Sequence, residues 1–198
     1  MSKRIAITKR LYIREIEDGD QDLVYELSQE SSLFSDMPRD DEFVALYKKY
    51  NWEEANSPCT YNGMIFRKDT DEFVGKICMQ FTDREVPELG IDIMNAMKNF
   101  GYGPEAIEAF CTFYWSKTGV AKIKVRISKS NSHSIHIFEK LGAEYIGSTS
   151  YVSENSLDMM RELLPDADLG ELSQDSVREY ILHLPMNMEW NEDAQFSE

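Results

Sequence analysis

The sequence predicts a single α+β domain with a mixed β-sheet and flanking helices. Two observations support this class: the order of the predicted elements, β-α-α-β-β-β-α-β-α-β-β, and the length of 198 residues, which suits one domain with one sizeable core. The composition, 42% hydrophobic and 12% aromatic with only 10 Gly and 6 Pro, excludes a disordered or fibrous chain. We expect the domain to span residues 1–186 and an acidic C-terminal tail to follow at 187–198.

The elements of the N-terminal half follow from the spacing of apolar residues and from the residues at their ends. Alternating apolar residues predict strands, and apolar residues three and four positions apart predict helices. Asp20 fits the N-cap of a first helix, and Pro38 fits the first turn of a second. The strands expected in this half are residues 11–16 and a hairpin formed by 61–67 and 73–81.

The C-terminal half continues with strands and helices in alternation. A strand at residues 88–93 leads through a loop into a helix that ends at Gly119, a residue suited to a helix C-cap. The remaining expected elements are a strand around Val125, a helix at 131–141, and strands at 145–152 and 180–184. An insert at 153–179 separates the last two strands and carries eight acidic residues against two basic ones.

The net charge limits the classes of partner. With 21 Lys and Arg against 36 Asp and Glu, the charge is −15, so we do not expect nucleic acid to be the main partner, because phosphate-backbone binding needs a basic face. An acidic surface favours a cationic partner such as an amine or a basic peptide, or it serves solubility alone. No stretch approaches the roughly 20 apolar residues that span a bilayer, so we expect no membrane partner.

The cysteines and histidines indicate a reduced protein without a metal site. The three cysteines, Cys59, Cys78 and Cys111, are far apart and form no CxxC pair. The three histidines come without an HExxH motif, and the basic N-terminus lacks the apolar stretch of a secretory signal. We therefore expect a cytoplasmic protein.

The loop after the strand at 88–93 is the segment most informative about function. It contains Gly101 and Gly103, and Pro104 follows in the first helical turn, where a missing N–H costs nothing. The first N–H groups of a helix are unpaired and lie at the positive end of its dipole, so such a loop can seat a phosphate. A purely structural turn is the alternative interpretation. The spacing matches neither a P-loop nor a dinucleotide-binding fingerprint.

A second segment, residues 131–143, follows the next strand, and the two segments together resemble the GNAT N-acetyltransferase superfamily over residues 73–142. The family signature is Gln/Arg-x-x-Gly-x-Gly/Ala at a helix start, followed by Asn-x-x-Ser and Lys-x-Gly-Phe in a later helix. The matching residues are Lys98 in the Gln/Arg position, Gly101, Gly103, Asn131, Ser134, Lys140 and Gly142, with Ala143 in place of Phe. Residues 11–14, 73–75 and 88–90 look most like the branch that contains ribosomal-protein N-terminal acetyltransferases.

The resemblance implies a GNAT-like fold, acetyl-CoA as cosubstrate and a set of residues that hold it. The backbone of Ile91 and Ile93 would hydrogen-bond the pantetheine arm, with the Ile93 N–H near the thioester carbonyl, although both residues also suit a core. The other implied positions are Phe100, Gly101, Tyr102 and Gly103 at the pyrophosphate, Lys98 as added charge or a solvated lysine, Asn131 as a CoA ligand or a helix cap, and Phe138 where many members have Tyr.

Acetyl transfer to an amine also needs a group that takes the ammonium proton. Glu88 and Asp92, on the strand at 88–93, are the candidates, and Glu88 is the first choice. The alternative interpretation of each residue is a solvated acid on that strand with no role in catalysis. Because Phe138 cannot protonate the leaving thiolate, Ser134 is the nearest hydroxyl for that role.

The sequence thus predicts direct acetyl transfer to a primary amine, either a protein N-terminus or a small cationic amine. The alternative is a non-catalytic acyl-CoA-binding or regulatory module with the same fold. The absence of Tyr at position 138 favours the module, whereas Glu88 and the intact glycine loop favour the enzyme. A monomer and a homodimer fit the sequence equally well, and no motif names the acceptor.

Overall fold

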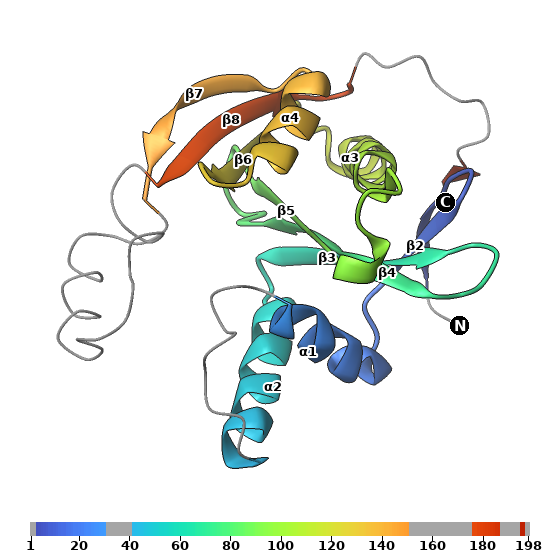
Figure 1. The fold of residues 1–198 in the computed structure, drawn as a ribbon. Coiled ribbons are helices and arrows are strands. Elements are labelled where there is room, and N and C mark those ends of the chain that lie inside the picture. Colours follow the sequence, from blue (N-terminus) through green and yellow to red (C-terminus); the bar gives the residue numbers. More distant parts are fainter. Residues whose placement is uncertain (1–2, 31–40, 151–175, 187–194, 197–198) are drawn as a thin grey trace, which may run out of the picture.

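The computed structural model describes residues 3–30, 41–150, 176–186 and 195–196 (Figure 1). Pro38 and residues 153–175 of the expected insert lie outside these ranges. The strands are β1 (Arg4–Ile7), β2 (Leu11–Glu15), β3 (Thr60–Arg67), β4 (Phe73–Gln80), β5 (Glu88–Ile93), β6 (Lys122–Ser128), β7 (Glu144–Thr149), β8 (Val177–His183) and β9 (Gln195–Phe196). The helices are α1 (Gln21–Gln29), α2 (Asp41–Ala55), α3 (Tyr102–Thr118) and α4 (Ser132–Lys140), with 3₁₀ turns at Asp18–Asp20 and Asn95–Met97.

Within the described ranges the strands form one sheet of nine, in the order β7-β8-β6-β5-β4-β3-β2-β1-β9. The β5–β6 pair is parallel, and the other neighbouring strands are antiparallel. The predicted α+β class with a mixed sheet and flanking helices is therefore confirmed.

Both ends of the described chain differ from the sequence-based expectation. β1 has no counterpart among the predicted elements, because only its two central residues, Ile5 and Ala6, are buried and they do not alternate. The two-residue strand β9 lies in the range expected as a tail and pairs with β1. β8 begins at Val177, inside the range assigned to the insert.

Asp20 occupies the predicted N-cap of α1, but its side chain does not cap that helix. Its two carboxylate oxygens each accept a hydrogen bond from Arg14 of β2 at 2.6 Å, and one of them also accepts from the Glu17 N–H at 2.8 Å. The paired guanidinium offsets the cost of burying a carboxylate that is only 3% exposed. Asp20 thus ties the start of α1 to the sheet.

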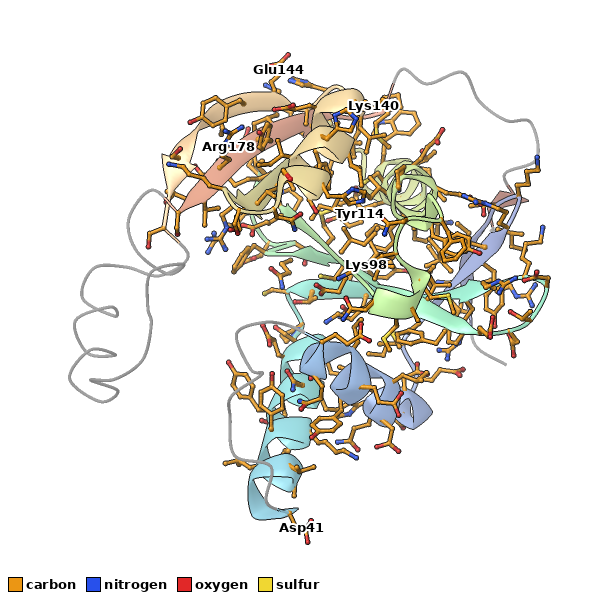
Figure 2. The ribbon with its side chains drawn as sticks, in the orientation of Figure 1. Asp41, Lys98, Tyr114, Lys140, Glu144 and Arg178 are labelled. Atoms are coloured by element: carbon orange, nitrogen blue, oxygen red, sulfur yellow. The ribbon has the colours of Figure 1, made fainter. Side chains whose placement is uncertain are left out.

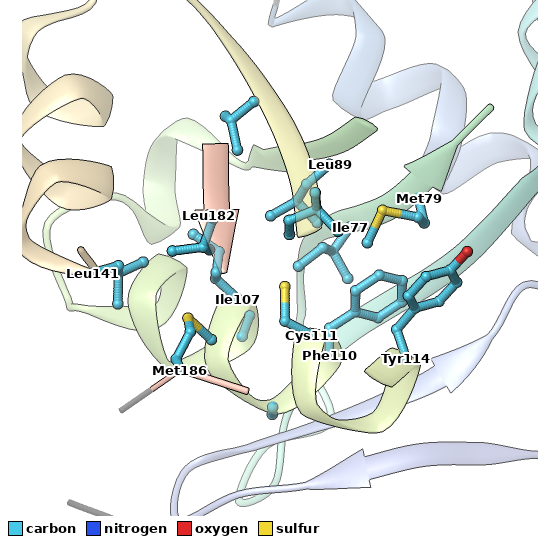
Figure 3. Close-up of a cluster of buried hydrophobic side chains, with 14 of the residues drawn as sticks. Ile77, Met79, Leu89, Ile107, Phe110, Cys111, Tyr114, Leu141, Leu182 and Met186 are labelled. Carbon is cyan, nitrogen blue, oxygen red and sulfur yellow. The ribbon is translucent and has the colours of Figure 1, made fainter. Parts of the chain in front are cut away.

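The helices lie on both faces of the sheet, with α1 and α2 on one side and α3 and α4 on the other (Figure 1). The larger core lies on the α3–α4 face, where Phe110 of α3 shares a buried cluster with Ile77 of β4 and Leu182 of β8 (Figure 3). A smaller core on the other face contains Val24 of α1 and Met64 of β3. Because successive side chains alternate across a sheet, each strand contributes to both faces.

The sheet opens at the parallel junction between β5 and β6. Only one pair of residues is in register there, Glu88 with Lys124, whereas β4 and β5 are paired over six positions and β6 and β8 over seven. Among the described strands, none pairs with the C-terminal half of β5 on its β6 side, and we call this the free edge of β5.

Two general features bear on the class of protein. No helix in the described ranges has the length and apolar character needed to cross a membrane. In the same ranges, no group of three or more His, Cys, Asp and Glu side chains is arranged to hold a metal ion. The three cysteines are free thiols, with Cys78 and Cys111 buried.

Candidate active site

The free edge of β5 presents the backbone groups of Ile91 and Ile93. The Met94 N–H donates to a carbonyl of β4 at 2.9 Å, and the Pro87 carbonyl accepts from an N–H of β6 at 2.8 Å. Because backbone groups alternate in direction along a strand, those of Ile91 and Ile93 point toward β6, as those of Pro87 do. The register with β6 ends before them, and both side chains pack against the larger core. Partly buried side chains and an available backbone are thus compatible.

The start of α3 has no side chain in front of its first N–H groups. Gly101 is the N-cap residue, and its φ of 76° lies in the left-handed region, which costs other residues roughly 1–2 kcal/mol. Gly103 has no such requirement, yet a Cβ built there would meet no atom of the described residues within 4 Å, apart from its chain neighbours and the backbone of its own helix. Both glycines line a cavity. This open helix N-terminus is suited to binding a phosphate group.

Arg10, which no sequence motif singles out, holds the turn before α3 in place. Its guanidinium donates to the carbonyl oxygens of Phe100 at 2.7 Å and Gly101 at 3.1 Å, and it lies 4.8 Å from the centre of the Tyr102 ring. Its Nε donates to the Glu105 carboxylate, in the first turn of α3, at 2.7 Å. Arg10 therefore fixes the backbone from which the helix N-terminus starts.

Replacing Arg10 with glutamine is expected to weaken acetyl-CoA binding about threefold to tenfold, the equivalent of about 1 kcal/mol. The turn would lose the two hydrogen bonds that fix its carbonyl groups. The rest of the fold would lose an ion pair whose arginine side chain is 44% exposed and the contact with the Tyr102 ring. Calorimetric titration with acetyl-CoA measures the effect, and Lys9→Gln, at an exposed neighbouring position, is the control. Equal affinities in Arg10→Gln and the wild type would show that the turn keeps its shape without Arg10.

The N-terminal half of α4 forms another part of the cavity wall. The Asn131 side chain caps α4, with Oδ1 accepting the Ser134 N–H at 3.0 Å, so its helix-cap interpretation is confirmed. Ser134 and Phe138 also line the cavity, and Phe138 is only 3% exposed and belongs to the larger core. Of these two side chains only Ser134 carries an exchangeable proton, and its role as the acid stays a prediction.

Lys98 and Phe100 lie on the same loop but differ in their relation to the cavity. Lys98 is part of the cavity wall, and its ammonium donates to Asn95 Oδ1 at 2.5 Å (Figure 2). The Phe100 side chain is not part of that wall, and 59% of the residue is exposed. Only the Phe100 backbone, held by Arg10, contributes to the turn.

One cavity, with a volume of about 1160 Å³, reaches both faces of the opened sheet. On the α3–α4 side it includes the free edge of β5 and the start of α3. On the α1–α2 side its wall contains Asn62 of β3, Cys78 of β4 and Asp92 of β5, together with Asn51 and Glu54 of α2. The opening beside β5 thus joins the N-terminus of α3 to a wall that carries carboxylates.

Glu88 does not belong to the cavity wall. Its carboxylate accepts a hydrogen bond from Arg126 of β6 at 2.8 Å, and its side chain is 15% exposed. Asp92, on the same face of β5, lines the cavity and forms no ion pair with another described residue. The structure therefore presents Asp92 to the cavity and gives Glu88 a contact across the β5–β6 junction, while the assignment of the base to Glu88 stays a prediction.

Cys78 is the thiol on the α1–α2 side of the cavity. Burial raises the pKa of this thiol to about 11, the carboxylates of Asp92 and Glu54 act in the same direction, and the Lys76 ammonium opposes them. Because the raised pKa keeps the thiol protonated at neutral pH, Cys78 is a poor nucleophile there.

The site as a whole brings together most of the residues that the sequence analysis assigns to acetyl-CoA. Those on the cavity wall are Ile91, Ile93, Lys98, Gly101, Tyr102, Gly103, Asn131, Ser134 and Phe138. Arg10, Asn62 and Glu54 belong to no motif and are not among the site residues predicted from the sequence. Their only sequence signal is polarity, and many surface residues share it.

Comparison with known proteins agrees with this geometry. The chain matches the acetyltransferase (GNAT) domain family over residues 10–144. The alpha/beta-tubulin-N-acetyltransferase 9 of Homo sapiens is 29% identical over 119 residues, which are 54% of this chain and 58% of that protein. The chain thus matches less than two thirds of that relative's length.

Solved structures share the fold. The spermidine N-acetyltransferase from Vibrio cholerae in complex with CoA and spermine has a TM-score of 0.65 at 15% identity, over 89% of this chain and 96% of that chain. A dodecameric structure of that spermidine N-acetyltransferase in an intermediate state has a TM-score of 0.64 at 14% identity, over 89% and 95%. The match to the family model covers more than half of the sequence, and the chain belongs to the GNAT acetyltransferase domain family.

Proposed function

We propose that this protein transfers an acetyl group directly from acetyl-CoA to a primary amine that arrives as a cation. The observation that carries the proposal is the cavity that joins the open start of α3 and the free edge of β5 to a carboxylate-bearing wall. The related proteins are named for tubulin and for spermidine, so a protein amine and a polyamine both belong to the acceptor class. Ribosomal-protein N-termini, the acceptors of the branch that the sequence resembles, are a third choice.

The α3–α4 side of the cavity would hold the cosubstrate. The pyrophosphate binds the N–H groups around Gly101 and Gly103, and Lys98 adds positive charge. The pantetheine arm lies along β5 as an additional strand, bonded to the backbone of Ile91 and Ile93. The Ile93 N–H then stabilises the negative charge that develops on the thioester oxygen.

The α1–α2 side would receive the amine. A carboxylate there takes one proton from the ammonium, and the amine then attacks the thioester carbonyl carbon. The C–N bond forms first and places negative charge on the former carbonyl oxygen, and the C–S bond breaks as the carbonyl is restored. The nitrogen loses its second proton to solvent, and the CoA thiolate takes a proton from Ser134, which regains one from solvent, or from solvent directly. Asp92 is placed on the cavity wall for the first step, and Glu88 is the competing assignment from the sequence.

Transfer without a covalent enzyme intermediate predicts that Cys78→Ala keeps kcat within about threefold of the wild type. The Cys78 thiol is protonated at neutral pH because burial raises its pKa to about 11, so it does not compete with the amine. Steady-state rates give the comparison, and mass spectrometry of enzyme incubated with acetyl-CoA alone is expected to show no acetyl group on Cys78. An acetylated Cys78 that is consumed on addition of an amine would contradict direct transfer.

Release of free CoA thiol tests the proposed function itself. The enzyme is mixed with acetyl-CoA and separately with spermidine, free amino acids, basic peptides and peptides with free N-termini. Acceleration by at least one amine, with the acetylated amine as product, supports the proposal. Slow hydrolysis unaffected by any acceptor would instead support the acyl-CoA-binding module, which Phe138 in the position of a family tyrosine favours.

The proposed setting is the cytoplasm, because Cys59, Cys78 and Cys111 are all free and a reducing compartment keeps thiols in that state. Light scattering of the purified protein distinguishes a monomer from a homodimer.

A further inference from the structure

Asn62 of β3 carries a buried polar atom that the fold does not use. The residue is 5% exposed and lines the α1–α2 side of the cavity. Its Oδ1 atom accepts no hydrogen bond from the described residues. An unpaired buried oxygen lowers the stability of the folded state, so a hydrogen-bond partner outside the described residues would explain why it is there.

The orientation of the Asn62 amide is fixed from its other end. Its Nδ2 donates a hydrogen bond to the carbonyl oxygen of Ala55, the last residue of α2. That carbonyl can only accept, so a flipped amide would place two oxygens against each other. The Oδ1 atom is therefore held away from α2, and rotation of the amide cannot satisfy it.

The surroundings of Asn62 favour a cation with N–H groups. Asn62 is in register with Cys78 of β4, and Cys78 is in register with Gly90 of β5, where no side chain stands. The carboxylates of Glu54 and Asp92 are close enough to act on the Cys78 thiol, and so is the ammonium of Lys76. Glu54, Asp92 and Lys76 also line the cavity that Asn62 lines, so two carboxylates against one ammonium leave this part of its wall net negative.

We propose that Asn62 positions the acceptor by accepting a hydrogen bond from its primary ammonium or amine, with Glu54 and Asp92 supplying the opposite charge. This inference rests on the proposed function and extends it, because it assigns the amine subsite to one oxygen atom. The subsite recognises the N–H groups of the acceptor as well as its charge. A quaternary ammonium, which has the charge without the N–H, is excluded.

Two cations of equal charge separate these features. Methylammonium has three N–H donors and tetramethylammonium has none. We expect methylammonium, titrated into the full-length wild-type protein, to shift the Asn62 side-chain amide resonance in ¹⁵N-edited NMR spectra, and tetramethylammonium to leave it unchanged. The resonance is assigned by its loss in Asn62→Leu. Equal shifts with both cations would reduce the effect to charge attraction, and no shift with either would remove the subsite; both results overturn the proposal.

A kinetic experiment tests the positioning role in turnover. Asn62→Leu is expected to lower kcat/KM for the best amine acceptor about 10-fold to 100-fold, as for the loss of a hydrogen bond to a charged group, while the Kd for acetyl-CoA stays within twofold. Asn56→Leu is the matched control, since the exposed Asn56 amide also donates to an α2 carbonyl, that of Trp52 at 2.8 Å, but does not line the cavity.

The outcomes of the two experiments distinguish failure of the amine subsite at Asn62 from failure of the proposed function. Equal losses in Asn62→Leu and Asn56→Leu would show that anchoring of the α2 end matters and the oxygen does not, which overturns the positioning role. The NMR titration needs no turnover, so it decides on the subsite even if no amine in the panel is acetylated. In that case the proposed function fails, and the NMR titration alone decides whether an amine binds at Asn62.

Discussion

Gly103→Val is expected to weaken acetyl-CoA binding at least about 100-fold and to leave the protein folded. The first N–H groups of α3 reach the pyrophosphate only if no side chain stands in front of them, and each charge-assisted hydrogen bond lost costs about 1.5–3 kcal/mol. We expect the protein to tolerate the change, because a Cβ at Gly103 meets no described residue outside its own local backbone within 4 Å and glycine is a poor helix former. Calorimetric titration with acetyl-CoA measures the loss of affinity.

Gly19→Val is the control for this experiment, since a Cβ at Gly19 also meets nothing within 4 Å and Gly19 does not line the cavity. Gly101 is a less suitable probe, because its φ of 76° would add backbone strain to any effect on the ligand. Unchanged affinity in a folded Gly103→Val protein would place the phosphates elsewhere.

Asp92→Asn is expected to lower kcat about 10²-fold to 10⁴-fold, the usual contribution of a general base, with little change in the Kd for acetyl-CoA. The Asp92 carboxylate faces the cavity and has no ion-pair partner among the described residues, so it can bind the incoming ammonium and take its proton. The loss should be largest at low pH, where the amine arrives protonated. The measurement is a pH profile of kcat for the variant and the wild type.

Glu88→Gln is the companion variant, since it keeps the shape of the side chain and removes the charge. The Glu88 carboxylate accepts a hydrogen bond from Arg126 at 2.8 Å and does not line the cavity, so it is less well placed than Asp92 to meet an amine there. We therefore expect a smaller loss of kcat in Glu88→Gln than in Asp92→Asn. The reverse order, with near-normal kcat in Asp92→Asn, would return the base to Glu88 as the sequence analysis assigns it.

Local signals in the sequence account for much of the fold. Gly119 ends α3 in the left-handed conformation, with φ of 71° and its N–H bonded to the Trp115 carbonyl at 2.8 Å, as the position of the glycine predicts. Asn131 caps α4 through the N–H three residues later. Such features depend on neighbours within four residues, so one sequence is enough to find them.

Contacts between distant residues account for most of what the sequence did not predict. Arg10 binds the carbonyl of Phe100, 90 residues away, and Arg126 binds Glu88, 38 residues away. Alternation along β5 places Glu88 and Asp92 on one face. It cannot show which of the two carboxylates forms a hydrogen bond with a side chain of the neighbouring strand. β1 likewise becomes a strand because β2 and β9 pair with it, and its own four residues carry no clear period.

The junction of β5 and β6 divides the sheet into two parts. Six strands lie on the β5 side and three on the β6 side, and a single residue pair holds the two parts in register. A pantetheine arm bonded to the free edge of β5 occupies the place where further pairs would have formed. Under the proposed function, a small molecule therefore supplies the hydrogen-bond partners that a neighbouring strand supplies elsewhere in the sheet. Binding of the acetyl donor is then expected to stabilise the folded protein as well as to fill the site, because a ligand that binds only the folded state shifts the folding equilibrium toward it.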